Sequence, residues 1–313
     1  MKFISPIHTP YCNHTIRMNH NNIDYYMKPQ PKPQPLLRVP TMNKQYIKHN
    51  DAITITFGDQ AENHVGMQKF GSLAQTGFDF NDLLNAKNKF DKLGAKCELV
   101  CLNDAISNID FDGKKDITNA YILVVRNGIN ILLRNGDQTN KQLYQELDIL
   151  DWDKKYYAYG GVRNKKARYN LCFGNKSQQP DYENKQGRVI SYDSVVPLKN
   201  IKENLPSFFG EKSTSLVAEG NRYYNVNDCG IGFHGDSERK KVIGLRIGSE
   251  FPLHYQWFIN SKQIGERIEF NFSNGDLYAM SEKATGFDWK KRKIATLRHA
   301  AGCAKYTTIK VKK

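Results

Sequence analysis

The sequence has no long hydrophobic run and no regular cysteine framework, and each absence argues against a class of protein. No stretch of its 313 residues approaches the roughly 20 consecutive apolar residues of a membrane-spanning helix. Residues 1–6 do not begin an apolar segment of the kind found in secretory signal peptides. The six cysteines fall at irregular intervals, and neither a nearby His nor a second cysteine pair completes a zinc site around Cys97 and Cys101. We therefore expect an intracellular, soluble protein with reduced thiols and no membrane span.

Positive charge, by contrast, is present in excess. Lysine and arginine total 46 against 32 aspartate and glutamate residues, which gives a formal net charge of +14. A charge of this size favours a polyanionic partner such as nucleic acid. The alternative is a lysine-rich surface that only keeps the protein in solution. The composition leaves both open, while 39% hydrophobic and 12% aromatic residues are enough for a packed core.

The chain divides by texture into an arm and two domains. Residues 1–50 lack periodicity, and within them residues 29–35 alternate proline with polar residues, which predicts an extended polyproline II segment. This arm is either a spacer or a ligand for a protein partner. Residues 51–150 predict a small α/β domain whose role the sequence does not indicate. Its expected strands lie at 52–57, 97–102 and 120–125, and its expected helices at 82–93 and 142–147.

Residues 151–313 have a different texture, with short strands separated by Gly, Asn and Asp turns. Segments with strand character follow at near-regular intervals, at 242–248, 254–258, 267–272, 276–280 and 293–298. This rhythm is typical of a β-sandwich or jelly roll. The predicted fold class is therefore α+β, with a small α/β domain and a C-terminal sandwich or jelly roll.

The tripeptide His234-Gly235-Asp236 carries the first chemical signal. Side chains alternate along an extended segment, so His234 and Asp236 are expected to point to the same side. An imidazole and a carboxylate are two thirds of the 2-His-1-carboxylate set, which binds non-heme Fe(II) and leaves positions open for O2 and a co-substrate. A His-x-Asp also occurs by chance in solvated turns, so the tripeptide alone does not indicate a site.

A basic strand near the C-terminus strengthens that signal. Arg292 and Arg298 fall on one face of the predicted strand because its side chains repeat with a period of two. Burial of an arginine inside a barrel costs free energy unless a carboxylate pairs with its planar guanidinium group. A small dicarboxylic acid that chelates the metal at one end and pairs with Arg298 at the other would meet both demands.

Together these segments resemble the AlkB-like Fe(II)/2-oxoglutarate dioxygenases. The resemblance is carried by residues 221–224, 232–238, 275–278 and 292–302. Its most specific part is the Arg-x5-Arg spacing that ends in Arg298 and is followed shortly by Gly302. It covers residues 151–313 and extends to uncharacterised members in large DNA viruses of protists, which look similar over most of the chain. It implies a C-terminal double-stranded β-helix (jelly roll), Fe(II) and 2-oxoglutarate as cofactors, and a location in the host cytoplasm or the virion.

The resemblance also implies roles for individual residues. His234 and Asp236 match the first two iron ligands, and Arg298 matches the arginine that binds the distal carboxylate of 2-oxoglutarate. The remaining matches are Arg292 near metal and co-substrate, Tyr223 or Tyr224 as a tyrosine that contacts the co-substrate, and Arg163, Lys165, Lys166, Arg168 and Tyr169 in the family's nucleotide-recognition lid.

One element of the family pattern is missing. The family places a second histidine well before the first arginine of the pair, and the segment that leads to Arg292 contains none. The metal-capable groups there are Glu282 and Asp288, whereas His299 neighbours Arg298 on the predicted strand and is expected to face away from the site. Asp288 as third ligand would make the site richer in oxygen. Otherwise two ligands and 2-oxoglutarate suffice, or metal binding is lost.

The function implied by the resemblance is oxygenation. 2-Oxoglutarate would be decarboxylated to succinate while a C–H bond is hydroxylated, and on an N-alkylated base of nucleic acid this leads to demethylation. Such a base must be single-stranded or flipped out. Basic residues with aromatic neighbours at 154–159 and 165–169 suit that partner, because charge holds phosphate and rings stack on bases. The alternative is a catalytically degenerate scaffold that binds nucleic acid or forms part of a virion, which the missing histidine and the proline-rich arm favour.

Overall fold

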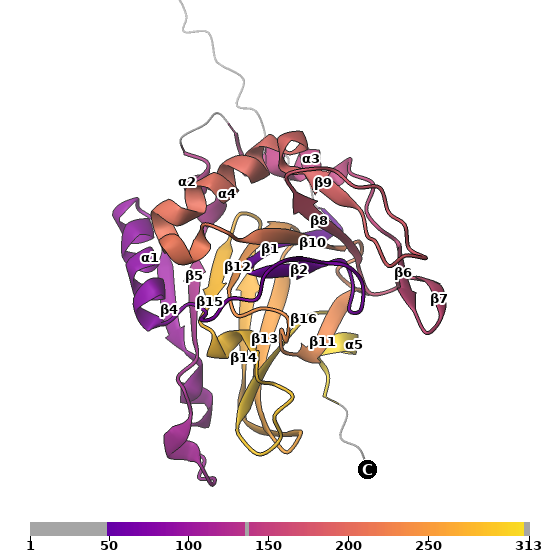
Figure 1. Cartoon of the computed structure of the whole chain (residues 1–313). Coiled ribbons are helices and arrows are strands. Elements are labelled where there is room, and N and C mark those ends of the chain that lie inside the picture. The colour runs from indigo at the N-terminus through magenta and orange to yellow at the C-terminus, as the bar shows by residue number, and fades with distance from the viewer. Residues whose placement is uncertain (1–48, 135–137, 310–313) are drawn as a thin grey trace, which may run out of the picture. The chain divides into compact units, whose positions relative to one another are not determined.

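Strands dominate the computed structural model, which describes residues 49–134 and 138–309 (Figure 1). An eight-stranded sheet and a four-stranded sheet are accompanied by short hairpins and a few helices, so the predicted α+β class is confirmed. The predicted N-terminal arm and its proline-rich segment lie outside the described residues, apart from residues 49 and 50.

The larger sheet joins strands that are far apart in the sequence. From edge to edge it runs β4 (Cys97–Cys101), β5 (Tyr121–Val125), β15 (Leu277–Met280), β12 (Val242–Gly248), β1 (Ala52–Gly58), β10 (Val217–Tyr223), β8 (Tyr169–Gly174) and β9 (Val189–Ser191). All neighbours are antiparallel except β8 and β9. The first described strand, β1, therefore lies in the middle of the sheet, between strands that come much later in the chain.

The smaller sheet faces one side of the larger one. Its four antiparallel strands are β11 (Gly230–His234), β16 (Thr296–Gly302), β13 (Phe251–Ile259) and β14 (Lys262–Phe272), in that order. Apolar side chains of both sheets form a common core, to which Val124 and Val242 contribute from the larger sheet and Trp257 and Leu297 from the smaller. The two sheets thus pack face to face, as sheets of a β-sandwich do.

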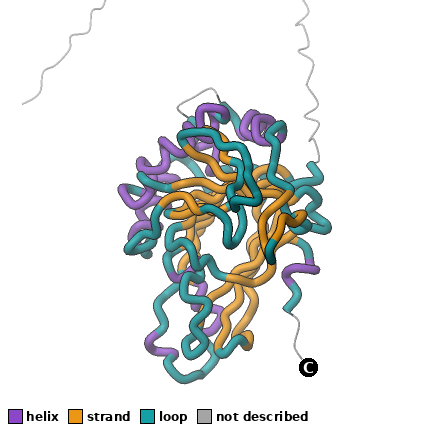
Figure 2. Tube along the Cα trace, turned by 45° about the vertical axis from the view of Figure 1, so that its right-hand side comes forward, coloured by secondary structure: helices purple, strands orange, loops and turns teal. Residues whose placement is uncertain are grey.

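Helices cover the other side of the larger sheet. They are α1 (Phe80–Lys92), α2 (Gly128–Leu132), α3 (Asn140–Asp148) and α4 (Val196–Phe209), and Figures 1 and 2 both show them gathered there. α1 begins at Asp79, where Asp79 and Asp82 accept each other's backbone N–H in a capping box. Its Leu83 and Phe90 are buried in a second core, between sheet and helices. Within the described residues, no helix is both long and apolar enough to span a membrane.

Side chains of β1 point alternately to the two faces of the larger sheet. Ile53, Ile55 and Phe57 are fully buried among the helix-facing residues. Thr54 and Thr56 point the other way, toward the space between the sheets, where they line a cavity. β1 is therefore buried on both faces, which explains why all seven of its residues are buried.

The strands expected within 51–150 form where predicted but do not make a sheet of their own. β1, β4 and β5 match the predicted segments 52–57, 97–102 and 120–125. All three join the same sheet as β10, β12 and β15 from the C-terminal half. The alternation that identifies a strand does not indicate which strand pairs with it. The hydrogen bonds of this sheet therefore cross the domain boundary that was expected at residue 150.

The central position of β1 predicts a large loss of stability on truncation of its buried side chains. Ile55→Ala should lower the free energy of unfolding by about 2–5 kcal/mol, because it opens a cavity in the helix-facing core. Ile149→Ala, at a side chain that is 83% exposed, should change it by less than about 0.5 kcal/mol. Urea unfolding of both variants checks this. Equal effects would show that β1 does not stabilise the core as described.

Candidate metal centre

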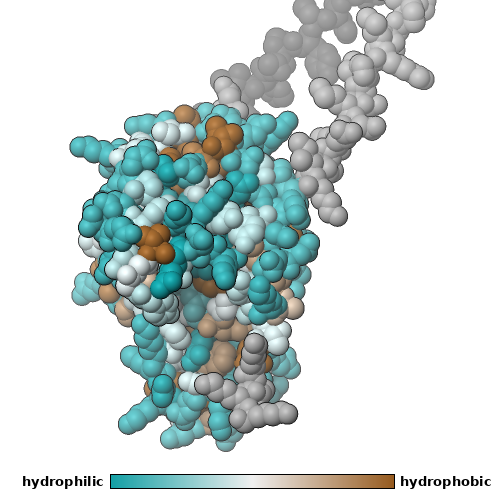
Figure 3. Space-filling model, turned by 90° about the vertical axis from the view of Figure 1, so that its right-hand side faces the viewer, coloured by the Kyte–Doolittle hydropathy of each residue, from teal (hydrophilic) through white to brown (hydrophobic). Residues whose placement is uncertain are grey.

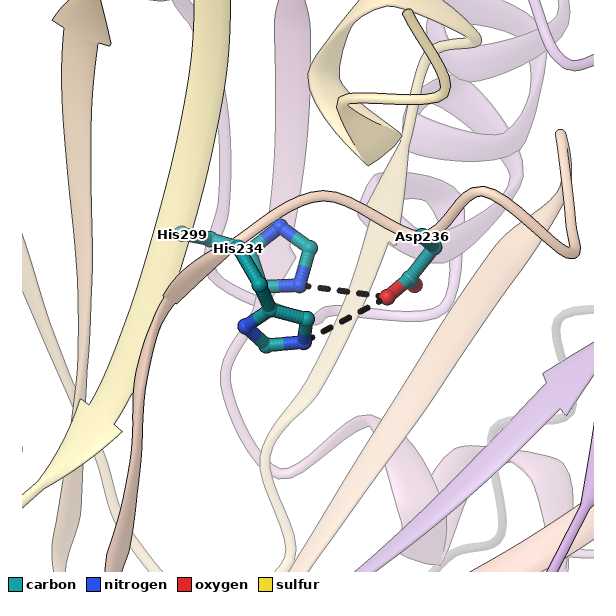
Figure 4. A group of neighbouring side chains, drawn as sticks. All are labelled: His234, Asp236 and His299. Carbon is teal, nitrogen blue, oxygen red and sulfur yellow. Dashed lines mark ion pairs between the residues drawn. The ribbon is translucent and has the colours of Figure 1, made fainter. Parts of the chain in front are cut away.

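Two neighbouring strands of the smaller sheet bring two histidines together. β11 ends at His234, and the antiparallel β16 places His299 directly opposite it. Directly opposed residues of antiparallel strands point to the same face, so both imidazoles lie on one side of the sheet. The chain then leaves β11 and brings the carboxylate of Asp236 toward both rings, as Figure 4 shows.

The three side chains are spaced like ligands of one metal ion. Oδ1 of Asp236 lies 3.6 Å from Nε2 of His234 and 3.5 Å from Nε2 of His299. One ligand atom from each residue lies within 4.8 Å of the others, and no second group with such spacing occurs in the described part of the chain. An ion bound at about 2.1 Å holds its ligand atoms about 3 Å apart, so small side-chain rotations would suffice.

The protonation states of the group suit a metal. Burial, together with the nearby His299, lowers the pKa of His234 to about 4, so its imidazole is neutral at physiological pH. Burial acts to raise the pKa of Asp236, but Arg239 and His299 outweigh it and hold that pKa well below its usual range. Nδ1 of His234 lies 2.8 Å from the carbonyl oxygen of Gly232, which leaves Nε2 free to bind an ion.

A buried arginine orients the carboxylate from behind. Nε of Arg239 lies 3.8 Å from Oδ2 of Asp236, whereas Oδ1 faces the histidines. Arg239 is 3% exposed and is held by Glu219 at 2.9 Å and Glu238 at 2.8 Å. Support of a ligating carboxylate by a neighbouring group is a general feature of metal sites. The charge of Arg239 thus attracts Oδ2 of Asp236, while Oδ1 faces the histidines.

The loop between His234 and Asp236 passes very close to another loop. A Cβ at Gly235 would lie 2.1 Å from the carbonyl oxygen of Gly286, so a side chain does not fit there. The backbone N–H of Asp236 donates to the carbonyl oxygen of Thr285 at 2.9 Å. Glycine at position 235 therefore lets the carboxylate turn back toward the two imidazoles.

A cavity of about 450 Å³ opens beside the three residues. Besides His234, Asp236 and His299, it is lined by residues of both sheets, among them Thr54, Tyr223, Arg246 and Tyr278 from the larger one. A cavity of this size accommodates a small organic acid together with part of a larger substrate. The group therefore borders a space from which ligands can approach it.

Two residues predicted for the site lie outside it. Arg298 and His299 do face opposite ways, but it is His299 that faces the cavity. The guanidinium of Arg298 stacks over the ring of Phe258 at 4.2 Å on the other face of the smaller sheet. Asp288 is not one of the three grouped residues, and its carboxylate pairs with Lys283 at 2.7 Å. The prediction that Arg298 faces His234 and Asp236 is corrected accordingly.

The remaining co-substrate predictions divide in the same way. Arg292 precedes β16 in an exposed loop, because the strand begins at Thr296 rather than at the predicted residue 293. Tyr223, on β10, lines the cavity. The hydroxyl of Tyr224 donates to the backbone carbonyl of Lys166 at 2.7 Å, outside the cavity. Of the two tyrosines that the sequence leaves open, the structure brings Tyr223 to the site.

The residues predicted for a nucleotide-recognition lid lie together, beside the cavity. Arg168 lines both this cavity and a neighbouring one of about 590 Å³, which Arg163, Lys165 and Lys166 also line. The ammonium of Lys165 is buried and donates to the side-chain oxygens of two asparagines. Burial lowers the pKa of Lys165 to about 7, so this lysine is a structural support and not a free surface charge. Tyr169 stacks on Tyr224, with ring centroids 4.5 Å apart.

The third residue of the group was missed although the sequence contains a signal for it. Leu297 and Ala301 contribute to the core between the sheets. Strand side chains alternate, so His299 must share their face, and Arg298 must lie on the other. The Arg-x5-Arg spacing instead favours Arg298, which lies on the opposite face of the strand.

Comparison with known proteins places the chain in a viral family. No model of a known protein family matches it. The uncharacterized protein R156 of Acanthamoeba polyphaga mimivirus is 50% identical over 256 residues, which are 82% of this chain and 97% of that protein. The chain belongs to the family of that viral protein. The predicted kinship with uncharacterised proteins of large DNA viruses is thereby confirmed.

The geometry of the group predicts which substitutions remove metal binding. His299→Ala and His234→Ala should each weaken Mn(II) binding at least about 100-fold, because two ligands hold a divalent ion much less tightly than three. Asp288→Ala should leave the affinity unchanged and serves as the control. Titration calorimetry on the metal-free protein measures all three. Wild-type affinity in His299→Ala would remove this residue from the ligand set.

Proposed function

We propose that this protein is an Fe(II)/2-oxoglutarate-dependent oxygenase of the AlkB-like kind. The observation that carries the proposal is the grouping of His234, Asp236 and His299 beside one cavity. Two imidazoles and one carboxylate are the ligand set of non-heme Fe(II) oxygenases, and they leave coordination positions for a co-substrate and O2. With both cofactors bound, the centre would supply oxidation of a substrate C–H bond by O2, coupled to decarboxylation of 2-oxoglutarate to succinate.

The strand order supports a double-stranded β-helix. The seven strands β10–β16 are divided between the sheets as in a jelly roll, with β10, β12 and β15 in the larger sheet and β11, β13, β14 and β16 in the smaller. A jelly roll needs an eighth strand, which in chain order would follow β16 and lie between the first and the third. β1 occupies that place, hydrogen-bonded to β10 and β12. We infer a jelly roll whose last strand is supplied by the N-terminal part of the chain.

The protein's own groups would position the ligands. The contact between Nδ1 of His234 and the carbonyl of Gly232 sets the direction of its ring. Arg239 holds one oxygen of Asp236, so the other remains available to an ion. The family's second histidine is missing before Arg292, and this favoured a degenerate scaffold. If His299 takes the role of that histidine, the argument for a degenerate scaffold no longer holds.

We propose single-stranded nucleic acid, or a base flipped out of a duplex, as the substrate. The cavity of about 590 Å³ is lined by His64, Tyr156, Tyr159 and several basic residues, and by no acidic one. It shares His64, Arg168 and Asn170 with the cavity of the metal centre. Cationic groups beside aromatic rings hold phosphates and stack bases.

A hairpin frames this second cavity. It is formed by β6 (Lys155–Ala158) and β7 (Gly161–Asn164), and Tyr159 at its tip is 92% exposed. The ring of Tyr156 stacks on His64, with centroids 3.8 Å apart. Figure 3 shows the face of the molecule on this side, where hydrophilic side chains predominate around a central hollow. A polyanion bound in this second cavity would lie beside the cavity of the metal centre, because the two cavities share lining residues.

Turnover of the co-substrate tests the oxygenase proposal. Purified protein with Fe(II), 2-oxoglutarate and O2 should release succinate, and His299→Ala should abolish the release because an iron ligand is lost. Arg298→Ala should retain it, since Arg298 lies on the outer face of the sheet. Chromatographic detection of succinate gives the rates. Absence of succinate from wild-type protein that binds Fe(II) and 2-oxoglutarate would contradict the proposal.

Binding to single-stranded DNA tests the substrate. The double variant Arg163→Ala/Lys166→Ala should weaken binding and reduce the slope of log K against log salt by about 1–2, because phosphate contacts are lost. A matched control is Lys92→Ala/Lys141→Ala, which removes the same charge from exposed positions on α1 and α3. Fluorescence anisotropy at several salt concentrations measures both. Equal losses in the two variants would point to net charge rather than to this surface.

A further inference from the structure

A buried arginine lies on the larger sheet without an acidic partner. Arg246, on β12, is 1% exposed and lines the same cavity as the three metal-binding candidates. Its guanidinium donates to the hydroxyl of Thr54, which lies opposite it on β1. Its Nε has no hydrogen-bond partner. Arg246 therefore presents unused donors inside the barrel.

Nearby carboxylates do not neutralise this charge. Asp276 directly precedes the neighbouring strand β15, but its carboxylate pairs with Arg126 at 2.7 Å. Among the described residues, no ion pair links Arg246 to an acidic side chain. A fully buried guanidinium without a counter-charge is expensive. Burial accordingly lowers the pKa of Arg246. An anionic ligand that enters the cavity would offset this cost.

The surroundings of Arg246 are shaped to leave room for such a ligand. The ring of Tyr278 lies across Gly244, where a Cβ would come within 2.1 Å of the ring carbon Cζ. Glycine at position 244 thus lets Tyr278 lie flat against β12 and line the cavity beside Arg246. Tyr223 lines the same cavity from β10. Two phenols, one threonine hydroxyl and one guanidinium form a polar wall on the larger sheet.

We propose that Arg246, with Thr54, binds the distal carboxylate of 2-oxoglutarate. The inference rests on the proposed function, because it assumes that the 2-oxo acid end of the same molecule chelates the metal. The planar guanidinium fork matches a carboxylate, and the metal-binding group and Arg246 border one cavity from opposite sheets. This assignment replaces Arg298, whose guanidinium stacks on Phe258 at the outer face of the smaller sheet.

The anchor would combine two distant parts of the chain. Thr54 belongs to the N-terminal strand β1, and Arg246 to β12, and their pairing is fixed by the antiparallel register of the two strands. The threonine hydroxyl holds the guanidinium in place and can itself donate to a carboxylate oxygen. Thr54 is therefore a positioning residue for the anchor, and its loss should weaken binding less than the loss of Arg246.

The test measures binding of 2-oxo acids to the Mn(II)-loaded protein by calorimetry, without turnover. Arg246→Met should weaken binding of 2-oxoglutarate at least about 30-fold, because a charge-assisted contact to the carboxylate is lost. Pyruvate, which has the 2-oxo acid group but no distal carboxylate, should bind equally to wild type and variant. Arg298→Met is the matched control and should bind 2-oxoglutarate like the wild type. Mn(II) affinity should be the same in all three proteins.

Thermal unfolding provides a second measurement that does not depend on calorimetric heats. Replacing a buried unpaired charge by methionine should not lower the Tm of the ligand-free protein. 2-Oxoglutarate should raise the Tm of the Mn(II)-loaded wild type and not that of Arg246→Met. A variant that unfolds on purification would be replaced by Thr54→Val, for which a smaller loss of 2-oxoglutarate affinity and unchanged pyruvate affinity are expected.

The possible results separate the inference from the proposal beneath it. Undiminished 2-oxoglutarate binding in Arg246→Met, or its loss in Arg298→Met, overturns the inference and leaves the oxygenase proposal standing. A wild-type protein that binds no Mn(II), or binds Mn(II) but neither 2-oxo acid, overturns the proposed function and the inference together. Loss of 2-oxoglutarate binding with retained pyruvate binding in Arg246→Met supports both.

Discussion

The antiparallel pairing of β11 with β16 is the constraint on which the candidate site depends. It sets His234 directly opposite His299, and the two rings lie with centroids 4.5 Å apart. A register shift by one residue would turn His299 to the outer face and bring Arg298 inward. The position of the third group, Asp236, does not depend on this register, because the loop after β11 brings its carboxylate back to the rings. One cross-strand pair thus decides whether a second imidazole or an arginine faces Asp236.

Two buried arginines line the same cavity and differ in how their charges are matched. Arg239 pairs with Asp236, Glu219 and Glu238, so its charge is more than matched. On the larger sheet, Arg246 has a hydroxyl and no carboxylate. The first arrangement is complete as it stands and serves to orient a ligand atom. The second is incomplete, which is why we connect it with a bound acid.

Much of the local structure follows from the sequence, and the pairing of its parts does not. The alternation at 52–57 and the helical spacing at 82–93 identify β1 and α1 almost to the residue, since period and capping are local properties. The place of β1 between β10 and β12 depends on contacts across most of the chain. His234 and Asp236 were predictable because they are neighbours in sequence. The sequence could indicate only that His299 lies on the buried face, while the pairing of His299 with His234 and of Arg246 with Thr54 depends on strand partners that are distant in the sequence.

The central place of β1 bears on how the chain folds. A ribosome releases this strand early, yet Ala52 must wait for Tyr223 and Gly248 before it has neighbours on both sides. Contacts between such distant residues carry a large loop-closure entropy and slow the search for the native state. Until then an apolar strand with two open edges is exposed to other chains. Nascent molecules of this protein should therefore depend on chaperones more than a β-protein whose strands pair in order of synthesis.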